Sequence, residues 1–217
     1  MILNMKRILF TFSAIFLVVA CGQTQTTIPT RDPGPPSSNE QAAYFAEGCF
    51  WHAEIVFQSL LGVRDAISGF SGGSAPSPSY EDVCTGSTGH AETVKVLYDP
   101  SKISFKTLVE AFFASVDPTQ LNRQGNDVGT QYRSVIFYRN AEEKKIIDDE
   151  IAMLTATHKF SGKIVTEVKP FANFYPAEDY HQEYILHHPG NGYVQAVSIP
   201  EYLEFRKTFK GPFKPNS

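Results

Sequence analysis

The fold is decided by one stretch, AAYFAEGCFWHAEIVFQSLL at residues 42–61. It begins with an apolar run typical of a buried strand, and residues 51–61 have the apolar spacing of a helix. Cys49 therefore lies at a helix start, where unpaired backbone N–H groups and the helix dipole favour the thiolate, the reactive form of cysteine. The large aromatic residues Phe50 and Trp51 follow it. A buried cysteine is more often an inert core residue, but this combination predicts a reactive thiol beside an apolar pocket.

Strands and helices are predicted to alternate along the rest of the chain. Strands are expected at residues 42–47, 62–70, 92–98, 134–138 and 163–168, and helices at residues 51–61, after Ser104 and after Asn140. Ser104 is a helix-capping residue, and Asn140 with Glu143 has the form of a capping box. From Pro170 onward the chain is predicted to be mostly irregular. This order predicts an α+β fold, a two-layer ferredoxin-like α/β sandwich with a long irregular C-terminal segment.

The composition fits one well-filled domain. The chain has 217 residues, of which 42% are hydrophobic and 13% aromatic, too few for two ordinary domains once a leader is removed. The net charge is −4 and no basic block stands out. Binding to nucleic acid is therefore not expected.

The first 20 residues are predicted to be a lipoprotein signal peptide. A basic pair, Lys6-Arg7, precedes an apolar run at residues 8–20 that is too short to span a bilayer comfortably. The run ends at Cys21 in a pattern that resembles a bacterial lipobox, in which the cysteine is lipidated; an ordinary signal peptide followed by a chance cysteine is the alternative. Two or more acyl chains anchor a protein stably. We therefore expect an exported protein, lipid-anchored to the bacterial cell envelope and facing the periplasm or the cell surface.

Two predicted loops, residues 71–89 and 117–131, carry clusters of polar side chains. Long loops inside a compact domain are usually functional. The informative blocks are GCFW at 48–51, YEDVCTGSTGHAE at 80–92, GNDVGTQYRS at 125–134 and AEDYHQ at 177–182. In this order, the blocks resemble those of the peptide methionine sulfoxide reductase A family. The resemblance covers residues 42–213.

The leader pattern, the composition and the resemblance together predict four units along the chain. They are the signal peptide at 1–20, the lipidated cysteine and a flexible linker at 21–41, the catalytic domain at 42–213 and a tail at 214–217. The linker is rich in Thr, Gln, Pro and Ser and has little apolar surface to bury.

The resemblance also implies the reaction and its residues. The family reduces the S epimer of methionine sulfoxide, free or in proteins, to methionine. Cys49 matches the nucleophile, which becomes a sulfenic acid, and Glu92 matches the acid that protonates the sulfoxide oxygen, which suits a carboxyl kept neutral by apolar surroundings. The residues that match the substrate-binding set are Phe50 and Trp51 around the methyl group, Tyr80 and Tyr132 at the oxygen, and Asp127 in the pocket lining.

Taken singly, these residues also have ordinary structural interpretations. Glu92 could be a solvated charge at a strand end, and Asp127 a turn residue. The histidines His52, His90 and His181 with Cys49 suggest a Cys-His acyl-transfer site. We interpret these histidines instead as hydrogen-bonding or surface residues. The pair His187-His188 suggests a metal, but no ligand spacing supports one, so no bound cofactor is expected.

The recycling step departs from the family pattern. Most relatives have a resolving cysteine in a C-terminal tail or at the position of His52, whereas no cysteine follows Cys84 in this chain. The position of Cys84 is generally not the resolver. We therefore expect an external thiol reductant, a thioredoxin-like protein or dithiothreitol, to act on a monomer whose substrates are oxidised proteins and free methionine sulfoxide. Two alternatives stay open: a secreted Cys-His acyl hydrolase or transferase, and a catalytically silent lipoprotein binding module.

Overall fold

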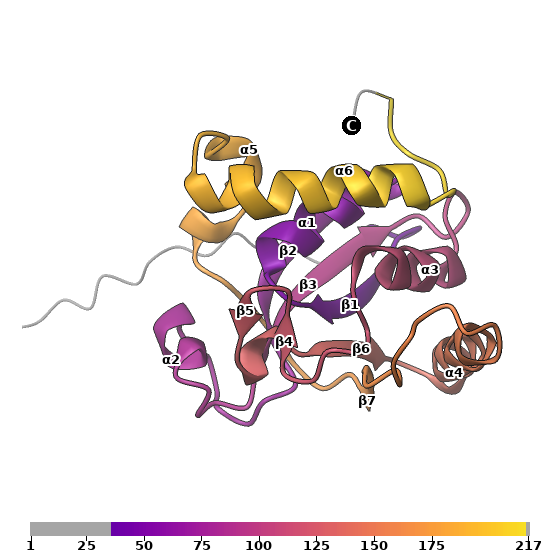
Figure 1. Ribbon diagram of the computed structural model, residues 1–217, viewed down its shortest axis with the longest axis horizontal. Helices are drawn as coiled ribbons and strands as arrows, with labels where there is room; N and C mark the ends of the chain where they lie inside the picture. Colours follow the sequence, from indigo (N-terminus) through magenta and orange to yellow (C-terminus); the bar gives the residue numbers. More distant parts are fainter. Residues whose placement is uncertain (1–35, 216–217) are drawn as a thin grey trace, which may run out of the picture.

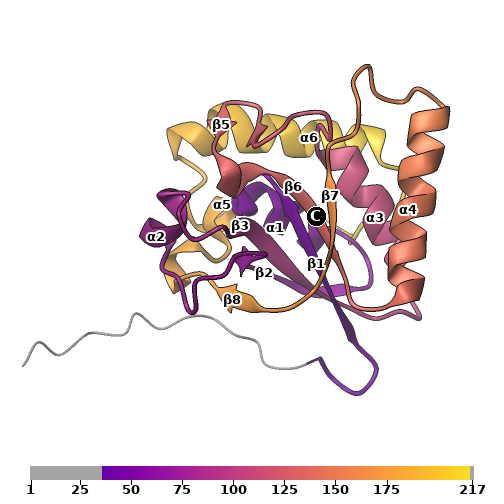
Figure 2. The same cartoon turned by 90° about the horizontal axis from the view of Figure 1, so that it is seen from below.

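The computed structural model describes residues 36–215, which form a mixed α/β fold around one six-stranded sheet (Figure 1). The strand order is β7-β6-β1-β3-β2-β8, so that β7 and β8 form the two edges (Figure 2). All neighbouring strands are antiparallel except β6 and β7. The predicted mixed fold is confirmed, while its finer assignment to the ferredoxin-like sandwich stays a prediction.

The strands of this sheet are β1 (Gln41–Glu47), β2 (Val63–Ser71), β3 (Ala91–Tyr98), β6 (Ser134–Tyr138), β7 (Glu167–Pro170) and β8 (Phe174–Pro176). A small hairpin pairs β4 (Arg123–Gln124) with β5 (Asp127–Val128). The α-helices are α1 (Phe50–Gln58), α2 (Tyr80–Cys84), α3 (Phe105–Ser115), α4 (Ala141–Ala156), α5 (Tyr184–His187) and α6 (Ile199–Thr208). Short 3-10 helices are η1 (Thr130–Tyr132) and η2 (Asp179–His181), and η3 (Val194–Ser198) is a π-helix.

The sheet is buried on both faces. Helices α1 and α3 pack on one face, and α6 packs on these two helices (Figure 1). On this face Phe45 of β1 stacks on Phe57 of α1 with ring centroids 4.7 Å apart. On the other face, Tyr44 stacks on Phe171 at 3.8 Å. Because successive strand residues point to opposite faces, Tyr44 and Phe45 belong to the hydrophobic clusters on opposite faces of the sheet. This explains why β1 is continuously apolar from Ala42 to Ala46 instead of alternating.

Two predicted helix starts are confirmed by their caps. The Ser104 side chain accepts a hydrogen bond from the Thr107 N–H at 3.0 Å, and the Asn140 side chain accepts one from the Glu143 N–H at 2.9 Å. The predicted capping box at Asn140 is only half formed, because the Glu143 carboxylate accepts from the Arg139 N–H instead. Its ion pair with the Arg139 guanidinium draws the carboxylate to that side.

β1 does not pair with β2, the strand that follows α1. β3 lies between β1 and β2 and is antiparallel to both. The predicted strand-helix-strand unit is therefore present, but a third strand is inserted within it. This insertion brings the start of β3, and with it Glu92, next to the turn that carries Cys49.

The prediction of a mostly irregular chain after Pro170 is wrong. This part contains β8, α5, the π-helix and the ten-residue helix α6. In α6, only Phe205 is fully buried and Leu203 is exposed, so its apolar spacing is weak. The helix depends on packing against α1 and α3, which a local pattern does not reveal. The short helix α2 inside a predicted loop was also missed, although its start carries a complete capping box between Ser79 and Asp82.

The predicted signal peptide, Cys21 and most of the linker lie outside the described residues. Within residues 36–215, the structure has no helix that combines the length and the apolar character needed to cross a bilayer.

Candidate active site

Cys49, the predicted reactive cysteine, lies at a sharp turn between β1 and α1. Gly48 ends the strand with φ +97°, and a Cβ at this position would lie 2.6 Å from the Cβ of Gln124. Both the backbone angle and the space therefore require glycine. Cys49 is the N-cap of α1, and its carbonyl accepts hydrogen bonds from the N–H groups of His52 and Ala53 at 3.1 and 3.3 Å. The turn holds the thiol at the start of the helix, as predicted.

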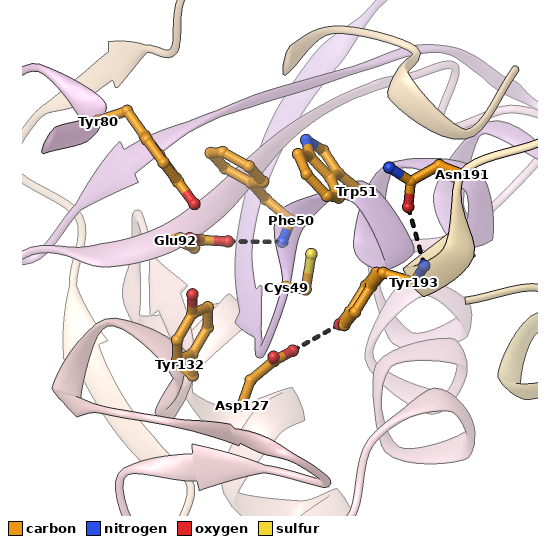
Figure 3. Close-up of a pocket in the computed structure, with 9 residues that line it drawn as sticks. All are labelled: Cys49, Phe50, Trp51, Tyr80, Glu92, Asp127, Tyr132, Asn191 and Tyr193. Atoms are coloured by element: carbon orange, nitrogen blue, oxygen red, sulfur yellow. Dashed lines mark hydrogen bonds between the residues drawn. The ribbon is translucent and has the colours of Figure 1, made fainter. Parts of the chain in front are cut away.

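The thiol opens into a cavity of about 310 Å³ (Figure 3). The cavity brings together all seven predicted catalytic and substrate-binding residues of the domain, and two that were not predicted. Its lining residues are Cys49, Phe50, Trp51, Tyr80, Glu92, Asp127, Tyr132, Asn191 and Tyr193. They come from five separate parts of the chain, so the fold, not local sequence, assembles the site.

A buried carboxyl group stands beside the thiol. Glu92 is 2% exposed, and its Oε2 accepts a hydrogen bond from the Phe50 N–H at 3.0 Å. Burial raises the pKa of Glu92 to about 8, with a smaller contribution from the charge of Asp127, while the Phe50 hydrogen bond opposes the shift. Glu92 is therefore protonated at neutral pH and can donate a proton.

The expectation of a thiolate at Cys49 is wrong for the site without substrate. The N–H groups of Trp51 and His52 do lower the pKa of the thiol, as a helix start should. Burial raises that pKa more, and the negative charge of Glu92 adds to the increase, so the net pKa lies well above its ordinary value. When Glu92 is neutral its contribution disappears, while burial and the charge of Asp127 still raise the pKa of the thiol.

Two phenols complete the polar side of the cavity. Tyr80 comes from α2 and Tyr132 from η1, and their hydroxyl groups point toward Glu92 (Figure 3). Burial, and then the charge of Glu92, raise the pKa of both hydroxyls. Both groups therefore stay protonated and can donate hydrogen bonds to an oxygen bound beside Glu92.

The third side of the cavity contains the residues that sequence reasoning missed. The Tyr193 hydroxyl donates a hydrogen bond to Oδ2 of Asp127 at 2.6 Å and also contacts the Cys49 thiol. The Asn191 side chain accepts from the Tyr193 N–H at 2.9 Å and orients this tyrosine. Both residues lie in the segment predicted to be irregular, and nothing in their immediate sequence marks them as site residues.

The apolar wall of the cavity is a stack of aromatic rings. The Trp51 indole lies flat on the Tyr184 ring, with centroids 3.7 Å apart and planes 5° from parallel. The Phe50 ring packs on Tyr80 at 6.1 Å. The cavity thus has proton donors on one side and rigid apolar rings on the other, as a small molecule with one polar oxygen and apolar substituents would require.

No histidine lines this cavity among residues 36–215. His52 is buried on α1, and burial lowers its pKa to about 4. His90 is used structurally, since its ring nitrogens bond to Gly73 N and Ala75 O. His181 accepts a hydrogen bond from the Trp51 indole behind the wall. The interpretation of these residues as hydrogen-bonding histidines is confirmed for His90 and His181.

Comparison with known proteins decides the family. A sequence model described as "Peptide methionine sulfoxide reductase" matches residues 41–212. The chain belongs to this family. The predicted family and enzyme class, a peptide-methionine (S)-S-oxide reductase, are confirmed. The cavity residues named above all lie within the matched part.

Individual relatives of the family match over most of their length. The chain is 49% identical to the peptide methionine sulfoxide reductase MsrA of Picrophilus torridus, over 78% of this chain and 96% of the relative. It is also 49% identical to the MsrA of Pasteurella multocida, over 80% and 99%. Among solved structures, methionine sulfoxide reductase A of Corynebacterium diphtheriae is similar with a TM-score of 0.65 and 38% identity, covering 71% of this chain and 78% of that one. The reduced form of Saccharomyces cerevisiae Mxr1 has a TM-score of 0.66 at 35% identity, covering 76% and 92%.

The second cysteine of the domain lies beside the methionine sulfoxide reductase site, not inside it. Cys84 is exposed at the end of α2, four residues after Tyr80, and its thiol contacts the Tyr80 hydroxyl. Cys49 and Cys84 are both free thiols. Cys84 lines a separate surface groove with Gly86 and Thr130.

Proposed function

We propose that this chain reduces the S epimer of methionine sulfoxide, free or in proteins, to methionine by way of a sulfenic acid on Cys49. One observation carries the proposal: a thiol and a buried carboxyl whose pKa is raised to about 8 face the same cavity, which has rigid aromatic rings on its other side. Membership of the family supports the same reaction.

The cavity favours one placement of a sulfoxide. The methyl group packs against Phe50 and Trp51, and the oxygen lies among the proton donors Glu92, Tyr80 and Tyr132. With these two substituents held, only one configuration at sulfur presents its back to Cys49. Preference for a single epimer follows from this three-point arrangement.

The chemical step is an oxygen transfer that balances without a cofactor. The Cys49 sulfur first bonds to the sulfoxide sulfur, and the protonated oxygen then moves to the Cys49 sulfur, so that the sulfoxide S–O bond and the transient S–S bond both break as methionine leaves. The sulfoxide sulfur is reduced by two electrons and the cysteine sulfur is oxidised by two. Glu92 gives its proton to the oxygen and recovers one from the Cys49 thiol, so that the carboxyl is neutral again after the step.

An external thiol then restores the enzyme. Reduction of the sulfenic acid consumes two thiols, which form a disulfide, and releases the oxygen as water. No cysteine follows Cys84 in the chain, which supports a thioredoxin-like protein as the reductant, with dithiothreitol as its laboratory substitute. The leader that precedes Cys21 supports a lipid-anchored enzyme that repairs oxidised proteins in the bacterial cell envelope, where we propose that it acts as a monomer.

The proposal is tested by supplying the full chain with each epimer of methionine sulfoxide separately, together with dithiothreitol, and measuring methionine. We expect consumption of the S epimer, sparing of the R epimer and no methionine from Cys49→Ser. Equal rates on both epimers would contradict the placement. Hydrolysis of an activated acyl ester without methionine formation would favour the acyl hydrolase, and inactivity in both assays would favour the binding module.

A further inference from the structure

One side chain behind the apolar wall contacts several wall residues at once. The Trp51 indole N–H donates a hydrogen bond to Nδ1 of His181 at 3.2 Å. The His181 ring also packs against Phe50 and Tyr80, with centroid distances of 5.0 and 4.3 Å. His181 is 2% exposed and does not line the cavity. It therefore supports the wall from behind.

The hydrogen bond determines which nitrogen of His181 carries the proton. Neutral imidazole has one N–H and one acceptor nitrogen. Since Nδ1 accepts from the indole, the proton resides on Nε2. Burial lowers the pKa of His181 to about 4, so Nδ1 keeps its acceptor lone pair throughout the neutral range.

A histidine at position 181 makes the folded state less stable than an apolar ring of similar size would. Nε2 is buried and has no hydrogen-bond partner among the described residues, and an unpaired buried donor destabilises the folded state. A phenylalanine would pack among the neighbouring rings without that cost but could not accept from an indole N–H. The acceptor nitrogen is thus the property that distinguishes histidine here.

The backbone that carries His181 is tied to the central sheet. The next residue, Gln182, accepts from the Ser68 N–H of β2 and donates to the Ser68 carbonyl, both at 3.0 Å. Its amide also donates to the Ala177 carbonyl at 2.9 Å. These bonds fix η2 to β2, so His181 positions Trp51 from a rigid part of the fold.

We propose that His181, as the neutral tautomer protonated on Nε2, is a positioning residue that sets the orientation of the Trp51 indole and thereby the size of the methyl-binding side of the cavity. The ring of Tyr184 stacks on one face of the indole, and the hydrogen bond to His181 holds its N–H edge. Face and edge together set the orientation of the ring. The effect on substrate choice rests on the proposed function, whereas the hydrogen bond does not.

The first test detects the hydrogen bond by NMR and does not depend on enzyme activity. Trp51 is the only tryptophan in the chain, so a ¹⁵N–¹H correlation spectrum of the full chain contains one indole N–H peak. We expect this peak downfield and slow to exchange with solvent, and a two-bond imidazole spectrum that places the His181 proton on Nε2. A proton on Nδ1 would overturn the proposal even if no variant folds.

Three variants then separate positioning from packing. His181→Asn retains an acceptor near the place of Nδ1, His181→Leu removes it at similar volume, and His158→Asn is a matched control on an exposed histidine far from the site. We expect the indole peak to move upfield and exchange faster in His181→Leu only. An unchanged indole peak in that variant would contradict the proposal.

The second test measures substrate choice. For His181→Leu we expect KM for methionine S-sulfoxide to rise about fivefold, with a smaller change in kcat, and the preference for methionine over ethionine S-sulfoxide to fall. His181→Asn should restore both values toward wild type. If the indole peak moves in His181→Leu but the preference for methionine over ethionine S-sulfoxide does not change, the substrate-selecting role of His181 is refuted. Absence of reduction by the wild type would instead refute the proposed function and leave the spectral result standing.

Discussion

The backbone N–H of Phe50 and the carboxyl of Glu92 are joined by a buried hydrogen bond of 3.0 Å. This bond links the start of β3 to the first turn of α1 and occupies one carboxyl oxygen only. It places Glu92, the proposed proton donor, next to the residue that follows Cys49 in the chain. The relative position of acid and thiol is therefore determined by one short contact between two rigid elements.

The raised pKa of Glu92 predicts how the sulfoxide step depends on pH. The acid is active when protonated, and burial raises its pKa to about 8. The rate should therefore be maintained through neutral pH and fall as the pH rises through 8. Single-turnover rates of methionine formation between pH 6 and 10 measure this decline, and a rate that keeps rising above pH 8 would exclude Glu92 as the proton donor.

Removing the proton of Glu92 should slow the same step without unfolding the site. Glu92→Gln keeps an oxygen that can accept from the Phe50 N–H, but an amide is a very weak acid. We expect kcat to fall by about 10²- to 10⁴-fold with little change in KM, and the decline above pH 8 to disappear. Glu204→Gln, a change at an exposed residue of α6, should behave as wild type.

A second buried carboxyl predicts that stability falls with increasing pH. Glu47 is 1% exposed, and burial raises its pKa from 4.5 to about 8 despite a hydrogen bond from Ser115. Between these values the folded state holds a proton that the unfolded state lacks. The free energy of unfolding should therefore drop by up to about 1.4 kcal/mol for each pH unit in that range.

Glu47→Gln tests this dependence because the amide resembles the protonated carboxyl. Its stability relative to wild type should increase between pH 5 and pH 8, as measured by urea unfolding at both values. A constant difference between the two proteins would mean that Glu47 is not protonated when folded.

The exposed thiol should be dispensable for turnover with dithiothreitol. Cys84 contacts the Tyr80 hydroxyl, and serine can preserve that contact. We expect Cys84→Ser to keep most of its activity. Peptide mapping of the wild type after one equivalent of substrate should find no Cys49–Cys84 disulfide, and detection of such a bridge would make Cys84 the resolving cysteine.

Membrane attachment should depend on Cys21, which lies outside the described residues. Cys21→Ala removes the thiol that a lipid would modify. We expect the variant to leave the membrane fraction or to remain unprocessed in fractionated bacterial cells. Detergent-dependent membrane association that is unchanged in the variant would point to an uncleaved apolar leader.

The sequence predicted best the features that short motifs encode. Three of the four motifs place residues in the cavity, as Glu92 and Tyr132 show, whereas the motif at 177–182 contributes no lining residue. The caps at Ser104 and Asn140 depend on neighbours within one helical turn. Strand β6 was predicted with its observed bounds, Ser134–Tyr138, because a run of β-branched and aromatic residues follows Ser134.

Features that depend on distant contacts were not predictable in this way. Asn191 and Tyr193 reach the cavity only because the chain after Pro170 is held against the sheet and α1. The thiolate expectation for Cys49 took account of the helix start alone. That expectation left out the burial of the thiol and the charge of Glu92. Glu92 lies near the thiol because β3 is inserted between β1 and β2.

The most direct test of the central claim is the product of a single turnover. The full chain is mixed with one equivalent of methionine S-sulfoxide in the absence of reductant, methionine is quantified, and sulfenic acid is trapped with dimedone and located by mass spectrometry. The account predicts one methionine formed for each dimedone adduct on Cys49. Methionine formed without modification of Cys49 would contradict it.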